Sequence, residues 1–274
     1  MLNTKQLILA GSLALAASAA NAELITFQVC PSCVGEPQAN FAANYIDFSY
    51  SALVDQTVVA PATGTFTEEG AGFFSSYRYP TLSDPVIGTG LNDTYKMYAV
   101  FNGGGTVSPS LGGGINVSFT SFSMQIWVDT NANTTLSFGD VGGVDNDGLG
   151  DALVFGNTAD DIMVGATVPG GVMYGEAHVF PGLAAGDFDV LVEIDPTDIN
   201  AAGNGDDFFQ SPLFMGMNFG DFNGVNTVLE GFSPFSFVDG KITGSGNLSF
   251  VPEPTTLALL GLGLVGLSVS GRRK

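Results

Sequence analysis

Short runs in which apolar and polar residues alternate, separated by glycine-rich turns, constrain this chain more than any other feature. The alternation has the period of a strand that buries one face of a sheet. It is clear in five stretches, residues 46–52, 95–101, 115–119, 122–128 and 188–194. A change of parity near Thr120 and Ser121 indicates a β-bulge or a bend. The Gly-Gly and Asp-Gly pairs between the runs are typical of turns. We therefore expect an all-β fold, a single antiparallel β-sandwich or jelly-roll-like domain.

The N-terminal segment is typical of a secretory signal peptide. A single charge at Lys5 precedes an apolar stretch over residues 7–17, and an A-x-A motif follows. The residues of the expected cleavage site are Ala20, Ala22 and Glu23. We expect residues 1–22 to be removed on export, which leaves residues 23–250 as the β-sandwich body. An uncleaved N-terminal membrane anchor is the alternative.

The C-terminal segment has three parts: an acidic turn with two prolines, an uncharged stretch rich in Leu and Gly, and a basic end. The turn is Val251, Pro252, Glu253 and Pro254, and the basic end is Arg272, Arg273 and Lys274. The prolines prevent an upstream strand from continuing into the stretch. A membrane span needs about 20 apolar residues, or about 17 at the short end. Residues 255–271 therefore predict a short transmembrane helix whose basic end stays on the cytoplasmic side.

This arrangement resembles the PEP-CTERM sorting signal of exported bacterial proteins, over residues 251–274. The resemblance implies that an exosortase-type membrane protease recognises the tail and removes it, after the tail has anchored the protein transiently in the inner membrane. It also implies a Gram-negative source, and the cell surface or extracellular matrix as the destination. An ordinary single-span C-terminal anchor is the alternative. Either way, the tail gives an address and no activity.

A second resemblance appears once the strands are placed. Several segments are similar to the flocculation-associated subgroup of PEP-CTERM proteins: residues 88–99, 122–129, 133–136, 208–212 and 240–248. The similarity extends from about residue 41 to the end of the sequence. It implies a secreted protein of the biofilm matrix that helps cells to aggregate in exopolysaccharide. It implies no catalytic residue.

The charge of the body excludes one class of function. Of the seven Lys and Arg residues, four lie in the end segments, whereas 26 of the 27 carboxylates lie in residues 23–250, so this body has a formal charge of −23. Nucleic acid binding needs cations against the phosphates and is set aside. An acidic surface instead attracts divalent metal ions, basic proteins or cationic polymers. Disorder is disfavoured, because the chain contains 22 Phe and disordered acidic chains are poor in aromatic residues.

Two clusters of oxygen-bearing side chains follow the strand that ends near residue 128. Residues 129–140 place Asp or Asn at positions 1, 3, 5 and 12 of a twelve-residue loop, which is the spacing of a calcium loop. Position 6 is Thr134 where such a loop has Gly, and position 12 is Asp where it has Glu. With a second cluster included, the candidate calcium ligands are Asp129, Asn131, Asn133, Asp140, Asp145, Asp147 and Asp151. Surface turns that bind no metal are the alternative.

Cys30 and Cys33 are the two cysteines, and in an oxidising export compartment we expect a local disulfide between them. A redox C-x-x-C motif, or a zinc site with His178, are the alternatives. The sequence contains no G-x-S-x-G, H-E-x-x-H or phosphate-loop motif. His178 is the single histidine, and its apolar surroundings in the sequence favour a packed or surface residue over a catalytic base. We therefore expect no enzyme.

Together these observations predict an exported, surface-sorted, non-enzymatic matrix protein whose Asp-rich loops bind or bridge calcium. A secreted carbohydrate-binding module or glycan-active enzyme is the main alternative, because aromatic side chains on a sheet could stack on sugar rings and carboxylate pairs are numerous. A coat protein without any ligand is the third interpretation.

Overall fold

The computed structural model describes most of the expected body. The described residues are 26–59, 63–79, 85–110, 114–138, 153–171, 173–179, 186–195, 208–210, 218–230 and 239–252. Within them the chain forms β-strands and one short 3-10 helix, η1 (Pro31–Val34), and no α-helix. The expected signal peptide and transmembrane helix, at residues 1–22 and 255–271, lie outside this part. Among the described residues, no helical segment has the length and hydrophobicity needed to cross a membrane.

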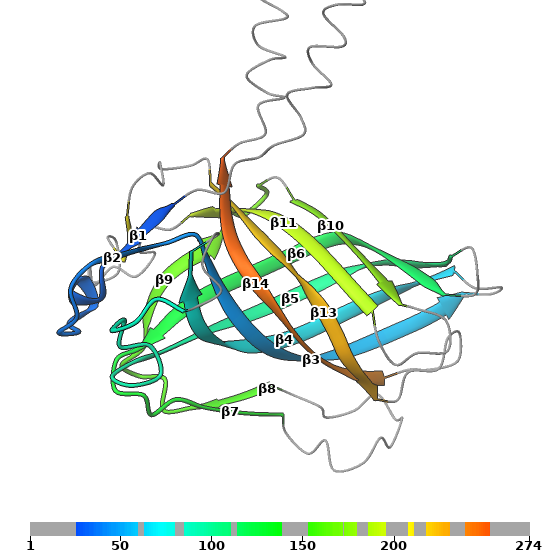
Figure 1. Cartoon of the computed structure of the whole chain (residues 1–274). Helices are drawn as coiled ribbons and strands as arrows, with labels where there is room; N and C mark the ends of the chain where they lie inside the picture. Colours follow the sequence, from blue (N-terminus) through cyan, green and yellow to red (C-terminus); the bar gives the residue numbers. More distant parts are fainter. Residues whose placement is uncertain are drawn as a thin grey trace, which may run out of the picture.

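Nine strands pair into one antiparallel sheet that closes on itself (Figure 1). Their order is β10-β11-β13-β14-β3-β4-β5-β6-β9, and closure follows because β6 also pairs with β10 and β11 also pairs with β9. The strands are β3 (Tyr45–Val59), β4 (Thr63–Arg78), β5 (Lys96–Pro109), β6 (Ile115–Asp129), β9 (Ile162–Thr167), β10 (Met173–Val179), β11 (Gly186–Asp195), β13 (Asn218–Glu230) and β14 (Asp239–Pro252). The prediction of an all-β antiparallel fold is confirmed. The strands belong to one closed sheet, whose opposite walls face each other as the two layers of a sandwich do.

Period-two alternation decides which side chains enter the closed sheet. On β11, Val190 and Val192 are at most 2% exposed, whereas Asp189, the residue before Val190, is exposed. Opposite walls meet inside, where the rings of Tyr50 on β3 and Phe188 on β11 have centroids 5.3 Å apart. Of the bulge or bend expected from the change of parity, the structure shows a bulge. Ser121 pairs with Gly104 and Phe119 with Gly105, which leaves Thr120 as the additional residue.

A small three-stranded sheet covers the end of the closed sheet at which β14 ends. Its strands are β1 (Phe27–Val29), β2 (Phe41–Ala43) and β12 (Phe209–Gln210), in the order β12-β1-β2. We call this sheet together with η1 the cap. Phe27 packs edge-on against Phe209 and Phe250, with ring centroids 5.8 and 5.0 Å away. Phe250 lies on β14 and is fully buried, so the cap packs directly on the last strand of the closed sheet.

A two-stranded hairpin, β7 (Thr135–Phe138) and β8 (Leu153–Gly156), lies along the outside of the closed sheet (Figure 1). Phe155 of this hairpin stacks on Tyr98 of β5, with ring centroids 5.8 Å apart. Tyr98 alternates with the inward residues Met97 and Ala99 and therefore points outward, yet it is only 3% exposed. The hairpin thus buries an outer position of the sheet.

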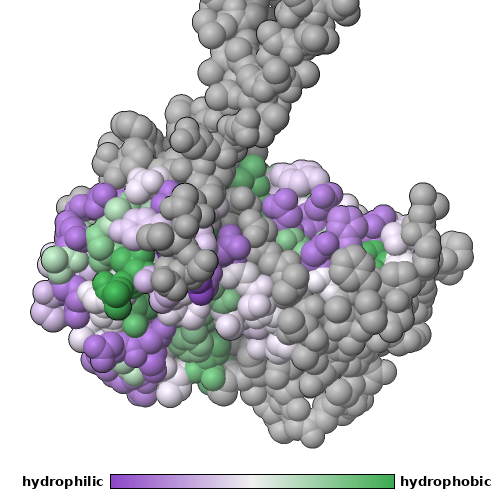
Figure 2. All heavy atoms as spheres, viewed as in Figure 1, coloured by the Kyte–Doolittle hydropathy of each residue, from purple (hydrophilic) through white to green (hydrophobic). Residues whose placement is uncertain are grey.

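The outer surface over β10 and β11 is mostly hydrophilic (Figure 2). Strand β10 turns Tyr174, Glu176 and His178 outward, between residues that are buried or nearly buried. Three large hydrophobic residues of the described part are exposed, namely Ile87, Val154 and Tyr174. They come from three different segments, so they form no continuous stretch of the chain.

Candidate functional site

Three aspartates from two separate loops converge at one end of β6. Asp129 is the last residue of β6, and Asp160 and Asp161 lie between β8 and β9. One carboxylate oxygen from each lies within 4.8 Å of the others, and the described residues contain no other group of this kind. We call these three residues the aspartate cluster. Carboxylate oxygens are ligands for hard cations such as calcium and magnesium.

Local hydrogen bonds fix the buried member of the cluster. Asp129 is fully buried, and its two oxygens accept the backbone N–H groups of Asn131, at 3.3 Å, and Thr134, at 2.7 Å. Between these donors the chain turns through Ala132, whose φ is 56°. The Lys96 Nζ donates to the Ala132 carbonyl oxygen at 2.9 Å. Asp129 therefore shapes the loop whether or not a cation is bound.

A second set of hydrogen bonds orients Asp161. The Tyr98 hydroxyl donates to Asp161 Oδ2 at 2.5 Å, and the Thr134 hydroxyl donates to the same oxygen at 2.8 Å. Burial raises the pKa of Asp161, and the charges of Asp129 and Asp160 raise it further, whereas the two hydrogen bonds lower it. Burial and the hydrogen bond to Asp161 also raise the pKa of Tyr98. Like charges thus lie close together at this site, an arrangement that a divalent cation relieves.

The third member of the cluster is open to solvent. Asp160 is exposed, and its Oδ2 accepts a hydrogen bond from Asn131 Nδ2. Asp160 and Asp161 are the residues that the sequence reasoning missed. They follow Asp129 by about 30 residues, and the β7–β8 hairpin returns the chain so that they reach the cluster.

The sequence-derived candidates divide into two groups. Asp129, Asn131 and Asn133 lie in the loop of the aspartate cluster, where Asn131 contacts Asp160 and Asn133 contributes its backbone to local hydrogen bonds. The other candidates lie outside the described residues; they are Asp140, Asp145, Asp147 and Asp151. The described ligand geometry thus comes from two loops, rather than from successive positions of one twelve-residue loop.

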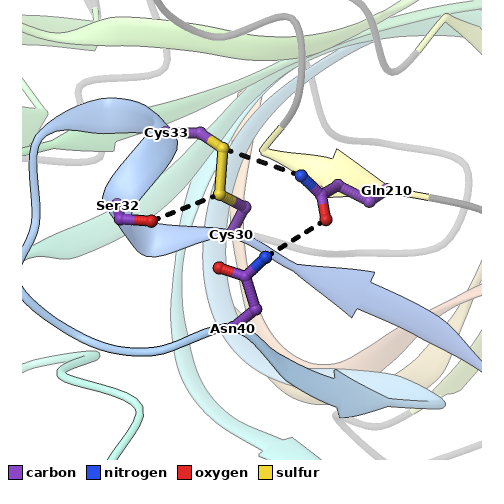
Figure 3. The surroundings of a disulfide bond; sticks show 5 residues. All are labelled: Cys30, Ser32, Cys33, Asn40 and Gln210. Carbon is purple, nitrogen blue, oxygen red and sulfur yellow. Dashed lines mark hydrogen bonds between the residues drawn. A yellow bond between two sulfur atoms is a disulfide. The ribbon is translucent and has the colours of Figure 1, made fainter.

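Cys30 and Cys33 are joined by a disulfide in the cap (Figure 3). Gln210 of β12 bridges this segment to its neighbours: its Nε2 donates to Cys33 Sγ at 3.6 Å, and its Oε1 accepts from Asn40 Nδ2 at 3.3 Å. The Cys30 backbone N–H also donates to the Phe208 carbonyl oxygen, at 2.8 Å. These contacts attach the disulfide segment to a strand that follows it by about 180 residues, which indicates a structural role.

His178 lies on the outer face of β10, about half exposed, with Nδ1 3.0 Å from Asp187 Oδ1 on β11. The two residues are directly opposite in the sheet register. His178 is far along the sheet from the cysteines, which are joined to each other, so the described geometry offers no zinc site made of Cys30, Cys33 and His178. The pair has the position of a cross-strand contact on the surface of the sheet.

Comparison with known proteins identifies the end of the chain. The family model of the PEP-CTERM protein-sorting motif matches residues 250–274. No curated protein and no solved structure matches the chain. The match begins at Phe250 inside the closed sheet and continues through Pro252, the last residue of β14. The chain therefore carries an exosortase-dependent signal for sorting to the cell surface, and this signal starts directly at the folded body.

Proposed function

We propose that this protein is a non-enzymatic component of the bacterial extracellular matrix that binds calcium and promotes cell aggregation in exopolysaccharide. The convergence of Asp129, Asp160 and Asp161 within 4.8 Å is the observation that carries the proposal. The sorting motif supports it, because it delivers the chain to the compartment in which cells and matrix meet. Calcium at extracellular concentrations suits sites whose dissociation constants are about 10⁻⁴ to 10⁻³ M.

The residues present fit such an ion in their chemistry. All three side chains offer carboxylate oxygens, Asp129 and Asp161 are held by hydrogen bonds from the protein, and Asp160 faces solvent. Bound calcium would supply positive charge at this site. Calcium takes about 6–8 oxygen ligands, so three carboxylates would leave some coordination positions open. The exposed side at Asp160 is where oxygen ligands of an acidic polysaccharide would approach.

The negative charge of the body explains why binding to an acidic polysaccharide would require calcium. Residues 23–250 have a formal charge of −23, because only three of the seven cations lie among them. A surface of this charge repels an acidic polysaccharide. Neutralisation at the aspartate cluster lowers this repulsion locally and permits contact with the polymer.

Thermal unfolding of the full chain in calcium and in chelator tests the binding step. At about 10 mM calcium, dissociation constants of about 0.1–1 mM give roughly 1.4–2.7 kcal/mol of added stability, which is a rise of about 3–10 °C in Tm for a body of this size. We expect the double substitution Asp160→Asn with Asp161→Asn to abolish this rise. Asp93→Asn, at an exposed position in another loop, is the matched control and should leave it unchanged.

A Tm that is the same in calcium and in chelator would contradict calcium binding, and the protein would then fit the interpretation of a coat without ligand. A rise that persists in the double variant would show that calcium binds elsewhere on the chain, and would contradict the assignment to the aspartate cluster.

A further inference from the structure

A cavity of about 90 Å³ lies inside the closed sheet. It is lined by members of both hydrophobic clusters of the core: the large cluster that extends to the cap, and a smaller one made by residues of β3, β4, β5, β6 and β10. Most of its wall is aliphatic or aromatic. For comparison, an engineered apolar cavity of about 150 Å³ takes up benzene. This cavity is smaller, so it has room for a short aliphatic chain rather than a ring.

Two polar side chains enter this apolar wall from neighbouring strands. Gln56 lies on β3 and Glu68 on β4, and both line the cavity. Gln56 pairs with Phe66 in the sheet register, and Val54 pairs with Glu68, so Gln56 and Glu68 are diagonal neighbours on the inner face. Diagonal neighbours in an antiparallel pair are about 7–8 Å apart, which a single small ligand can bridge.

The Gln56 side chain is incompletely satisfied. Gln56 is 4% exposed, and its Oε1 has no hydrogen-bond partner among the described residues. A buried acceptor without a donor costs about 1–3 kcal/mol. The oxygen belongs to a side chain in the wall of the cavity, so a donor inside the cavity would remove this cost.

Glu68 is a second hydrogen-bond acceptor in the wall of the cavity, and its side chain fits there because the residue opposite is a glycine. Gly103 lies opposite Glu68 on β5, and a Cβ atom at Gly103 would lie 2.7 Å from Glu68 Oε1 and 3.0 Å from a ring carbon of Phe119. Burial raises the pKa of Glu68 to about 7, and Tyr50 is the other titratable group that lines the cavity. Burial and the charge of Glu68 raise the pKa of Tyr50, so the Tyr50 hydroxyl stays neutral.

The two cations whose side chains the structure describes are engaged elsewhere. Arg78 Nε bonds to Asp47, and Lys96 donates to Ala132. The cavity wall also contains several aromatic rings, among them Tyr50 and Phe101, whose centroids are 6.0 Å apart. Faces of aromatic rings attract a desolvated cation. The partly buried Glu68 carboxylate, the unpaired Gln56 oxygen and the aromatic rings together favour one kind of occupant.

We propose that the cavity binds a small organic amine in its protonated form, with a short aliphatic chain. The ammonium group donates hydrogen bonds to Gln56 Oε1 and to the Glu68 carboxylate, and the apolar part packs against the phenylalanine rings. An ammonium group suits both acceptors because it carries three donors and one positive charge. The formal charge of −23 on the body raises the local concentration of such cations. This site is separate from the aspartate cluster and does not depend on calcium.

Isothermal calorimetry on the full chain at pH 8, with n-butylamine and 1-butanol at constant ionic strength, tests the proposal. At this pH Glu68 is mostly ionised, because its pKa is about 7, while the amine remains protonated. We expect n-butylamine to saturate one site per chain, and 1-butanol to bind at least about tenfold more weakly, since hydrogen bonds to a charged group contribute about 1.5–3 kcal/mol.

Three variants and one control locate the site. Glu68→Gln and Gln56→Leu should each weaken n-butylamine binding at least about tenfold. Gly103→Ala should weaken it without any change of charge, because the added methyl group displaces the Glu68 carboxylate. Glu69→Gln removes an equal charge from an exposed position next in the chain and should leave binding unchanged, which excludes a general effect of surface charge.

Absence of n-butylamine binding would overturn the proposal. Equal binding of n-butylamine and 1-butanol would overturn the role of the ammonium group. Full binding by the Glu68→Gln variant, with its fold verified by circular dichroism, would overturn the assignment of the site.

Discussion

Replacing Glu68 by Gln should stabilise the protein above neutral pH and change little in acid. Burial raises the pKa of Glu68 from 4.5 to about 7, so the folded state favours the protonated acid. Stability from this group is fully present below pH 4.5 and is lost as the pH rises through about 7. At about 1.4 kcal/mol per pH unit, this loss is at most about 3 kcal/mol.

The Glu68→Gln variant keeps the shape of the acid and cannot ionise, so it avoids this loss. We expect it to exceed the wild type by at most about 3 kcal/mol at pH 8.5, which corresponds to about 6–12 °C in Tm for a body of this size. Near pH 4.5 the two proteins should be equally stable. Urea unfolding of both proteins from pH 4.5 to 8.5 measures the difference at each pH.

Comparison between variants removes the general effect of the acidic surface, which acts on both proteins alike. Glu69→Gln, on the outer face of β4, is the matched control, and its difference from the wild type should not follow the profile of Glu68→Gln. A stability difference for Glu68→Gln that is the same at every pH would refute the reasoning. A raised pKa of Glu68 in the folded state requires this difference to grow as the pH rises through about 7.

Three further predictions concern other parts of the molecule. Cys33→Ser should destabilise the protein by about 2 kcal/mol, because the disulfide closes a very short loop (sequence separation 3); urea unfolding measures this, and reduction of the wild type should give the same loss. Tyr98→Phe keeps the ring contact with Phe155 but removes the donor to Asp161, and should cost about 1–3 kcal/mol of stability in the same assay; an unchanged midpoint would show that the hydroxyl contributes nothing. Replacing Pro252 and Pro254 by Ala should reduce the fraction of the protein at the cell surface and increase the membrane-bound fraction, as measured by fractionation with immunoblotting; an unchanged distribution would show that the prolines are not read by the sorting machinery.

The strands could be predicted from the sequence because a strand with one buried face alternates apolar and polar residues. The inward residues of β3 and β11 and the bulge at Thr120 follow from this local rule. Closure of the sheet depends on pairing between β6 and β10 and between β9 and β11. Such pairing is a property of strand ends far apart in the chain, which alternation does not encode.

Only the part of the candidate site that lies within one local loop could be predicted from the sequence. Asp129 and Asn131 stand out because a local turn needs them next to one another. Asp160 and Asp161 join the cluster only because the β7–β8 hairpin returns the chain, and nothing in their own segment indicates a partner loop. Glu68 was overlooked as one of many carboxylates, although it occupies an inward position of β4 between Phe66 and Gly70.

Calcium-dependent aggregation of cells tests the central proposal most directly. Cells that display the wild-type chain are compared, at equal surface amounts, with cells that display the double variant Asp160→Asn with Asp161→Asn, and settling is measured in calcium and then in chelator. We expect wild-type cells to settle in calcium, to disperse in chelator, and to lose both responses in the double variant. Equal settling of the two strains in calcium, or settling of wild-type cells that persists in chelator, would contradict the proposal that the aspartate cluster links the protein to its matrix.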